Sequence, residues 1–143
     1  MTVIVLPIDG SVHSRCAATW LASTAALAAP RTVHVVHVSP VLGRTGFGTV
    51  DFEQQNREEA RVSFEAAHAI LDGRVDAIHE HWLRGDAAES IIGFAAEHGA
   101  DVLVLGAKGA GALRAALTGS VVSKVVAQSV VPTIIINSKD GDA

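Results

Sequence analysis

Short apolar runs rich in β-branched residues alternate with segments of helical periodicity along the whole chain, and this alternation constrains the fold more than any other feature. The predicted strands are Thr2–Ile8, Thr32–Val38, Val75–Leu83, Val102–Leu105 and Pro132–Ile136. The predicted helices are Val12–Ala28, Asp51–Leu71, Asp86–His98 and Val121–Gln128. Apolar strands separated by helices run parallel and need cover on both faces. Right-handed crossovers then favour an α/β fold, a doubly wound five-stranded parallel sheet with helices on both faces.

Several residues mark where these elements begin and end. Pro30 is expected to close the first helix, and Asp51 is expected to cap the second. The Asp72-Gly73 pair is expected to end that second helix. The segment Val41–Val50 carries glycines and is long enough to form a flexible flap.

Composition excludes several classes of function. The 143 residues carry 11 Lys and Arg against 15 Asp and Glu, with no basic cluster, which argues against nucleic-acid or anionic-membrane binding. No apolar run approaches the roughly 20 residues that span a bilayer. The lone Cys16 leaves no intramolecular disulfide, and the chain opens on a strand rather than a leader, so we predict a cytoplasmic protein. We expect one domain over residues 1–137 and a polar tail at 138–143.

The most specific motif is a glycine pattern near the C-terminus. Gly106 and Gly109 follow an apolar strand, and Gly119-Ser120 comes nine residues later, directly before a predicted helix. Glycine has no Cβ, so its backbone N–H can face a ligand closely. A helix N-terminus adds unpaired N–H donors and a partial positive charge of about half an electron. The pattern therefore predicts a phosphate site.

The predicted topology brings other polar turns to the same place. Ligands of doubly wound sheets bind beyond the carboxyl ends of the strands. Asp9–Ser11, Ser39-Pro40 and Gly106–Gly109 all follow predicted strands directly. We therefore expect these three turns to surround one site.

Taken in order, these pieces resemble the universal stress protein family. The likeness rests on Val5–Ser11, Val36–Val38, the Gly106-x2-Gly109-x9-Gly119-Ser120 motif and the terminal Val130–Ile136 strand, and it covers essentially the whole chain. The resemblance implies a Rossmann-like fold of the adenine nucleotide alpha hydrolase type. It also implies a homodimer formed through the last strand. Members with the glycine motif typically bind ATP.

The resemblance also implies roles for particular residues. Pro7 and Asp9 would lie beside the adenosine, and the backbone of Val38 would meet the adenine. The first glycine pair and Lys108 would wrap the ribose and phosphates, and the start of the last helix would meet the outer phosphates. The expected nucleotide-binding residues are Pro7, Ile8, Asp9, Val38, Leu105, Gly106, Lys108, Gly109, Gly119, Ser120, Val121 and Val122. Magnesium is expected with the ATP, because phosphates supply much of its coordination.

Two positions depart from the family pattern. Val122 stands where members usually have a second hydroxyl. The missing hydrogen bond would contribute about 1.5–3 kcal/mol, or one to two decades of affinity. Lys108 stands where Arg or His is common, and it offers a point charge rather than a bidentate fork.

Two residues of the expected site have both a structural and a ligand-binding interpretation. Asp9 can bind ribose or a metal, or it can cap the first helix together with Ser11, and both roles can hold at once. Ser120 can likewise act as a helix N-cap and as a phosphate ligand.

Four of the seven histidines fall on predicted strands. His79 and His81 are two apart and share one face of their strand, whereas His34 and His37 point to opposite faces. Zinc would need at least one further ligand, and no Cys lies nearby. We interpret all four as packing or edge residues.

The functional prediction is an ATP-binding regulatory switch. Nucleotide occupancy would order the Gly43–Gly48 flap and the segment Ala110–Thr118, and so change the surface offered to a protein partner. The alternatives are a slow ATPase and a nucleotide-free dimeric interaction module. Val130–Ile136 could be an outer parallel strand covered by helices, but the family resemblance favours pairing of this strand with a second copy.

Overall fold

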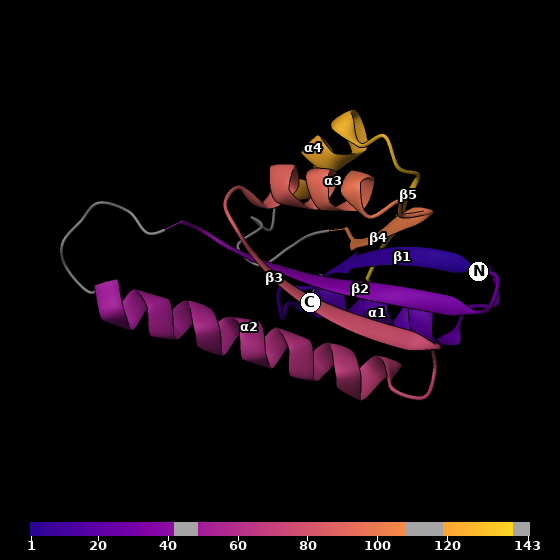
Figure 1. Ribbon diagram of the computed structural model, residues 1–143, viewed down its shortest axis with the longest axis horizontal. Coiled ribbons are helices and arrows are strands. Elements are labelled where there is room, and N and C mark those ends of the chain that lie inside the picture. Colours follow the sequence, from indigo (N-terminus) through magenta and orange to yellow (C-terminus); the bar gives the residue numbers. More distant parts are fainter. Residues whose placement is uncertain (42–48, 108–118, 139–143) are drawn as a thin grey trace.

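The computed structural model describes residues 1–41, 49–107 and 119–138 (Figure 1). Five strands form one parallel sheet in the order β3-β2-β1-β4-β5. They are β1 (Thr2–Pro7), β2 (Arg31–Ser39), β3 (Ala77–Arg84), β4 (Val102–Gly106) and β5 (Thr133–Ile136). The predicted five-stranded parallel sheet is therefore confirmed.

Helices cover both faces of the sheet, as predicted. They are α1 (Val12–Ser23), α2 (Thr49–Leu71), α3 (Ala87–Glu97) and α4 (Ser120–Gln128). In Figure 1, α3 and α4 lie above the sheet, and α1 and α2 lie below it. Among the described helices, none is both long and apolar enough to cross a membrane.

Side chains of the central strands alternate between two cores. Ile4 and Leu6 of β1 pack with α1 and α2, whereas Val5 packs with α3 and α4. β4 divides in the same way, because Val104 joins the first core and Leu105 the second. Strands buried on both faces explain why the sequence shows continuous apolar runs rather than alternation.

The first helix is shorter than predicted. It ends at Ser23 rather than Ala28, and residues up to Pro30 form the connection to β2. The guanidinium of Arg31 donates to the carbonyl oxygens of Leu21 (3.0 Å) and Thr24 (3.3 Å). These bonds satisfy the end of the helix, where carbonyls have no partner within the helix. A tertiary contact therefore ends α1 well before the proline.

The observed ends of the other helices differ less from the predicted ends. α2 begins at Thr49, so the prediction that Asp51 caps this helix is wrong. Gly73, with φ of 77°, follows the end of α2 as expected. Asp86 caps α3, since its carboxylate accepts from the N–H of Glu89 at 3.0 Å.

Some predictions fall outside the described residues. These concern the Gly43–Gly48 flap, the segment Ala110–Thr118, Lys108 and Gly109, and most of the polar tail.

Candidate functional site

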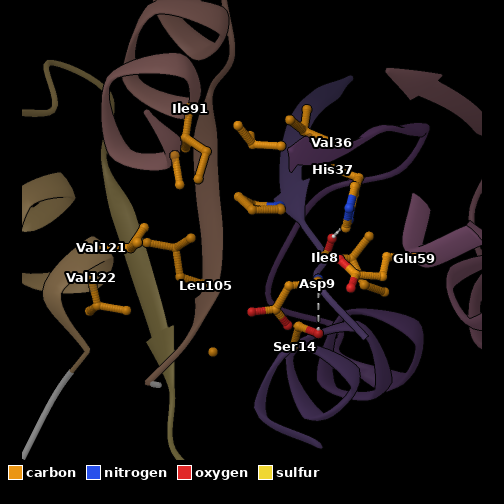
Figure 2. Close-up of a pocket in the computed structure, with 14 residues that line it drawn as sticks. Ile8, Asp9, Ser14, Val36, His37, Glu59, Ile91, Leu105, Val121 and Val122 are labelled. Carbon is orange, nitrogen blue, oxygen red and sulfur yellow. Dashed lines mark hydrogen bonds between the residues drawn. The ribbon is translucent and has the colours of Figure 1, made fainter. Parts of the chain in front are cut away.

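A cleft opens at the carboxyl ends of β1, β2 and β4, where the topology predicted a ligand site. Its volume is about 280 Å³, close to the lower end of the roughly 300–1,000 Å³ typical of ligand pockets. The lining residues are Pro7, Ile8, Asp9, Ser14, Val36, His37, Val38, Glu59, Ala87, Ile91, Leu105, Gly106, Val121 and Val122. Figure 2 shows that they form two facing walls.

The wall on the α3 and α4 side is apolar. Ile91 of α3, Leu105 of β4, and Val121 and Val122 of α4 lie together on this side of the cleft (Figure 2). Ile91 and Val122 are 3% and 4% exposed, so they belong to the core as well as to the cleft. We call these four residues the apolar wall.

The opposite wall carries polar groups. Asp9, Ser14, His37 and Glu59 lie on this side (Figure 2), and we call them the polar wall. Nδ1 of the buried His37 lies 2.8 Å from the carbonyl oxygen of Ile8. A carbonyl only accepts, so Nδ1 carries the hydrogen and donates, which leaves Nε2 as an acceptor in the neutral ring.

The turn from β1 to α1 is held by local hydrogen bonds. Ser11 is the N-cap of α1, and its hydroxyl accepts from the N–H of Ser14 at 3.2 Å. The Asp9 carboxylate accepts from the N–H of Ser11 at 2.9 Å, and Gly10 takes a φ of 81° between them. The capping role predicted for Ser11 is therefore confirmed, whereas the bond to Asp9 holds the turn before the helix and does not cap a helical N–H. A role for Asp9 toward ribose remains a prediction.

Gly106 is needed for packing, whatever the cleft binds. A Cβ at this position would lie 2.4 Å from the backbone oxygen of His13 and 2.5 Å from its carbonyl carbon. Only glycine lets the end of β4 approach the first turn of α1 so closely. The motif therefore contains at least one glycine with a structural reason of its own.

The start of α4 lies at the rim of the cleft. Gly119 is the N-cap, with φ of −68° and no side-chain capping bond. The prediction that Ser120 acts as N-cap is therefore wrong, because Ser120 is the first helical residue and is exposed. The next two residues, Val121 and Val122, line the cleft. The N–H groups in the first turn of a helix have no acceptors within it, so they are available to an anion.

Most of the residues predicted for the site lie along one cleft, although their contact with a nucleotide remains a prediction. Those that line it are Pro7, Ile8, Asp9, Val38, Leu105, Gly106, Val121 and Val122. Gly119 and Ser120 directly precede Val121 in the chain. Lys108 and Gly109 fall outside the described residues.

The structure adds six lining residues that the sequence did not single out for the site. They are Ser14, Val36, His37, Glu59, Ala87 and Ile91. His37 could have been predicted from the sequence, because it is a polar residue near the carboxyl end of the apolar strand β2. Glu59 had none, since it is one of many acidic residues on α2.

The charges of the described lining favour a ligand that donates hydrogen bonds. Asp9 and Glu59 supply carboxylates, and the described part of the lining includes neither Lys nor Arg. Within residues 1–41, 49–107 and 119–138, no three His, Cys, Asp or Glu side chains are grouped so that they could hold a metal ion. A cation accompanying a ligand would therefore depend on the ligand for most of its coordination.

The chain belongs to the universal stress protein family, whose pattern it matches over residues 1–137. It is 33% identical over 136 residues to a universal stress protein of Thermus aquaticus, covering 93% of this chain and 96% of that one. It is 29% identical over 136 residues to a universal stress protein of Methanocaldococcus jannaschii, covering 93% and 80% of the two chains.

Solved structures share the fold. The hypothetical protein MJ0577 superposes with a TM-score of 0.80 at 23% identity, over 97% of both chains. A universal stress protein in complex with cAMP gives 0.68 at 20% identity, over 96% of this chain and 98% of that one. An Arabidopsis thaliana family protein with AMP bound gives 0.65 at 15% identity, over 100% of both chains.

Proposed function

We propose that this universal stress protein binds an adenine nucleotide in the cleft and acts as a nucleotide-dependent regulatory protein. The observation that carries the proposal is the position of the cleft, at the carboxyl ends of β1, β2 and β4 with the start of α4 at its rim. Two structural relatives hold cAMP and AMP, which supports the ligand class. The glycine motif favours ATP with magnesium.

The two walls suit the two chemical characters of a nucleoside. The apolar wall offers aliphatic side chains to a flat base. The polar wall offers carboxylates on Asp9 and Glu59, and these groups accept from an exocyclic amine or from ribose hydroxyls. The volume of about 280 Å³ favours the nucleoside part in the described cleft, with the phosphates beyond it.

The phosphates would meet the first turn of α4. Its free N–H groups and the positive end of the helix dipole attract anions. Ser120 is exposed there and offers a hydroxyl, but Val122 is apolar and only 4% exposed. A site with a hydroxyl-bearing residue at position 122 would hold the triphosphate by one more hydroxyl contact than this one. We therefore expect micromolar rather than nanomolar affinity. Bound magnesium would be coordinated largely by the phosphates and would neutralise their charge.

The test is a calorimetric titration of ATP with magnesium into the native protein and two matched variants. Val121→Trp fills the cleft from α4, whereas Val126→Trp places the same side chain at a position of α4 that is 59% exposed. Native protein and Val126→Trp are expected to bind with equal affinity, and Val121→Trp is expected to lose at least tenfold.

Acid extraction of freshly purified protein complements the titration, because it reports nucleotide that was bound in the cell. Co-purified adenine nucleotide supports the proposal. Absence of binding at millimolar ATP, AMP and adenosine would contradict it, and so would equal affinities in the two tryptophan variants.

The exposed edge of β5 favours a dimer with a second copy of the chain. β5 is an edge strand and its residues are only half-buried. Val130, three residues before the strand, is 81% exposed. Pairing with a second copy would satisfy the open edge. Sedimentation velocity would show a dimer that is weakened by Val130→Lys and unchanged by Val126→Lys. A monomer at all concentrations would contradict this pairing.

A further inference from the structure

Four histidines gather on the α3 side of the sheet, and the proposed function uses none of them. The rings of His34 of β2, His81 of β3 and His98 at the end of α3 lie around Phe94. The fourth ring, that of His79 of β3, stacks on His34. The ring centroid of His34 lies 5.2 Å from that of His79, 5.1 Å from His81 and 5.5 Å from His98. We call these four residues the histidine cluster.

One hydrogen bond inside the cluster depends on its protonation. Nδ1 of His34 lies 2.9 Å from Nε2 of His81. One nitrogen must donate and the other accept, so at least one ring has to be neutral. When both rings are protonated, every ring nitrogen carries a hydrogen, and two N–H groups face each other between two cations. The rings then have to separate.

The charged groups acting on this bond are themselves histidines. Burial lowers the pKa of His34, and His81, His79 and His98 lower it further. Burial also lowers the pKa of His81, together with His98 and His79. Every described neighbour named here adds repulsion once it is protonated, so the cluster resists taking up several protons at once.

Of the other charged residues on the surrounding elements, Lys124 and Glu80 form ion pairs away from the cluster, whereas Glu97 lies next to it in the sequence. Lys124 of α4 lies at the opposite end of α3, where it contacts Asp86 and Glu89. Glu97 is exposed and immediately precedes His98 on α3. The alternate residue of β3, Glu80, contacts His68 on the other face of the sheet.

The cluster is connected to the cleft through α3. Phe94 stacks on His98 at 3.8 Å between centroids and packs on His81 at 4.5 Å. One turn earlier on the same helix, Ile91 lines the cleft, and Ala87 lines it a further turn before. A movement of Phe94 therefore moves the helix that supplies part of the apolar wall.

We propose that the histidine cluster is an acid-sensitive latch that holds α3 against β2 and β3, so that protonation of its rings loosens α3 and the apolar wall of the cleft. Histidine clusters are suited to this role because they change charge near physiological pH. The effect on ligand affinity rests on the proposed function, whereas the loosening of α3 does not. Ligand binding and protonation oppose each other reciprocally.

The sign of the pH dependence follows from the lowered pKa values. The unfolded chain binds protons on His34 and His81 more tightly than the folded protein does. The stability contributed by these rings is therefore complete above their ordinary value of 6.5, and it is lost as the pH falls from 6.5 through the lowered values.

The test compares the native protein with the double variant His34→Asn, His81→Gln. Asn offers a polar atom near the position of Nδ1, and Gln offers one near Nε2, so the variant can keep the hydrogen bond without a titrating ring. Hydrogen exchange of α3 amides, corrected for intrinsic rates, is measured at pH 7.5 and pH 5.5 with α1 as the internal reference. Native α3 is expected to lose protection by about tenfold at pH 5.5 relative to α1, and the variant less than about threefold.

Adenosine is the probe for the cleft, because it has no group that titrates between these pH values. Its affinity for the native protein is expected to fall by about tenfold at pH 5.5 and to stay nearly constant in the variant. Equal loss of α3 protection in both proteins would overturn the latch. Loosening of α3 with unchanged adenosine affinity would overturn its control of the cleft. Absence of adenosine binding at both pH values would contradict the proposed function, while the exchange result would still decide the latch.

Discussion

The two walls of the cleft are built in different ways. The apolar wall consists of side chains that also fill the core on the α3 and α4 side, such as Leu105 and Ile91. The polar wall is held by hydrogen bonds, from His37 to Ile8 and within the β1–α1 turn. Substitutions in the apolar wall should therefore reduce stability and binding together. Substitutions at the exposed residues of the polar wall, Asp9 and Glu59, can change binding while stability stays nearly constant.

The largest expected effect comes from Gly106→Val, where the end of β4 meets the first turn of α1 at the cleft. The new Cβ would lie 2.4 Å from the backbone oxygen of His13, and backbone cannot move aside as a side chain can. We expect the free energy of unfolding to fall by about 3 kcal/mol or more, measured by urea denaturation.

Gly93→Ala is the matched control for this substitution. Gly93 lies in α3, and a Cβ there would meet nothing within 4 Å. Alanine should raise the stability by about 0.5–1 kcal/mol because it favours a helix over glycine. A Gly106→Val protein as stable as the native one would contradict the close approach of β4 and α1.

Ile91→Ala tests the joint role of the apolar wall. Ile91 is 3% exposed, so its truncation should cost about 2–4 kcal/mol of stability and also weaken nucleotide binding. The neighbouring Ile92 is half-buried in the same core but does not line the cleft. Ile92→Ala should therefore reduce stability with unchanged affinity in calorimetry. Equal nucleotide affinities in the two variants would contradict the claim that Ile91 contacts the ligand and Ile92 does not.

Asp9→Asn tests the independence of the polar wall. Asparagine keeps an oxygen that accepts from the N–H of Ser11, so stability should change by less than about 1 kcal/mol. Loss of the carboxylate charge should reduce nucleotide affinity by about tenfold, or 1.4 kcal/mol. Asp101→Asn is the control, since Asp101 accepts from the N–H of Val3 outside the cleft. The result that would contradict the proposed role is a similar affinity in both variants.

The smallest expected effect on stability comes from His68. This residue lies outside both walls, so its substitution shows how much pH dependence arises away from the cleft. Its hydrogen bond to Asp72 raises the pKa of His68, and Glu80 raises it further. The stabilisation is therefore complete below the ordinary value of 6.5 and is lost as the pH rises through the raised value. Because the pair is exposed, His68→Gln should cost only about 0.5 kcal/mol at pH 6 and less at pH 8 in thermal unfolding. A larger cost at pH 8 than at pH 6 would contradict this sign.

Most of the fold follows from local patterns. The β-branched runs predicted β1, β2, β4 and β5, and Gly73 and Asp86 marked the end of α2 and the start of α3. The end of α1 could not be predicted in this way, because Arg31, from the following strand, satisfies its last carbonyl groups. Only the folded chain brings that side chain to the helix.

The site was predictable to a similar extent. Val121 and Leu105 came from the resemblance, and both line the cleft. Ile91 and Glu59 lie on helices whose periodicity shows an inward or outward face but not which strand end the helix will cover. Ser14, His37 and Glu59 of the polar wall therefore needed the structure, whereas Asp9 and the residues around the glycine motif were marked by sequence.

The central claim is that a nucleoside lies between the two walls, and methyl NMR during a nucleotide titration tests it most directly. An adenine ring in the cleft would shift the methyl signals of Ile91, Leu105 and Val121 through its ring current. The methyl signals of Leu71 and Val33, in the core on the α1 and α2 side, should remain unchanged. Saturable shifts of the wall methyls with ATP and adenosine are the predicted result. Shifts confined to other methyls, or none at millimolar ligand, would contradict the claim.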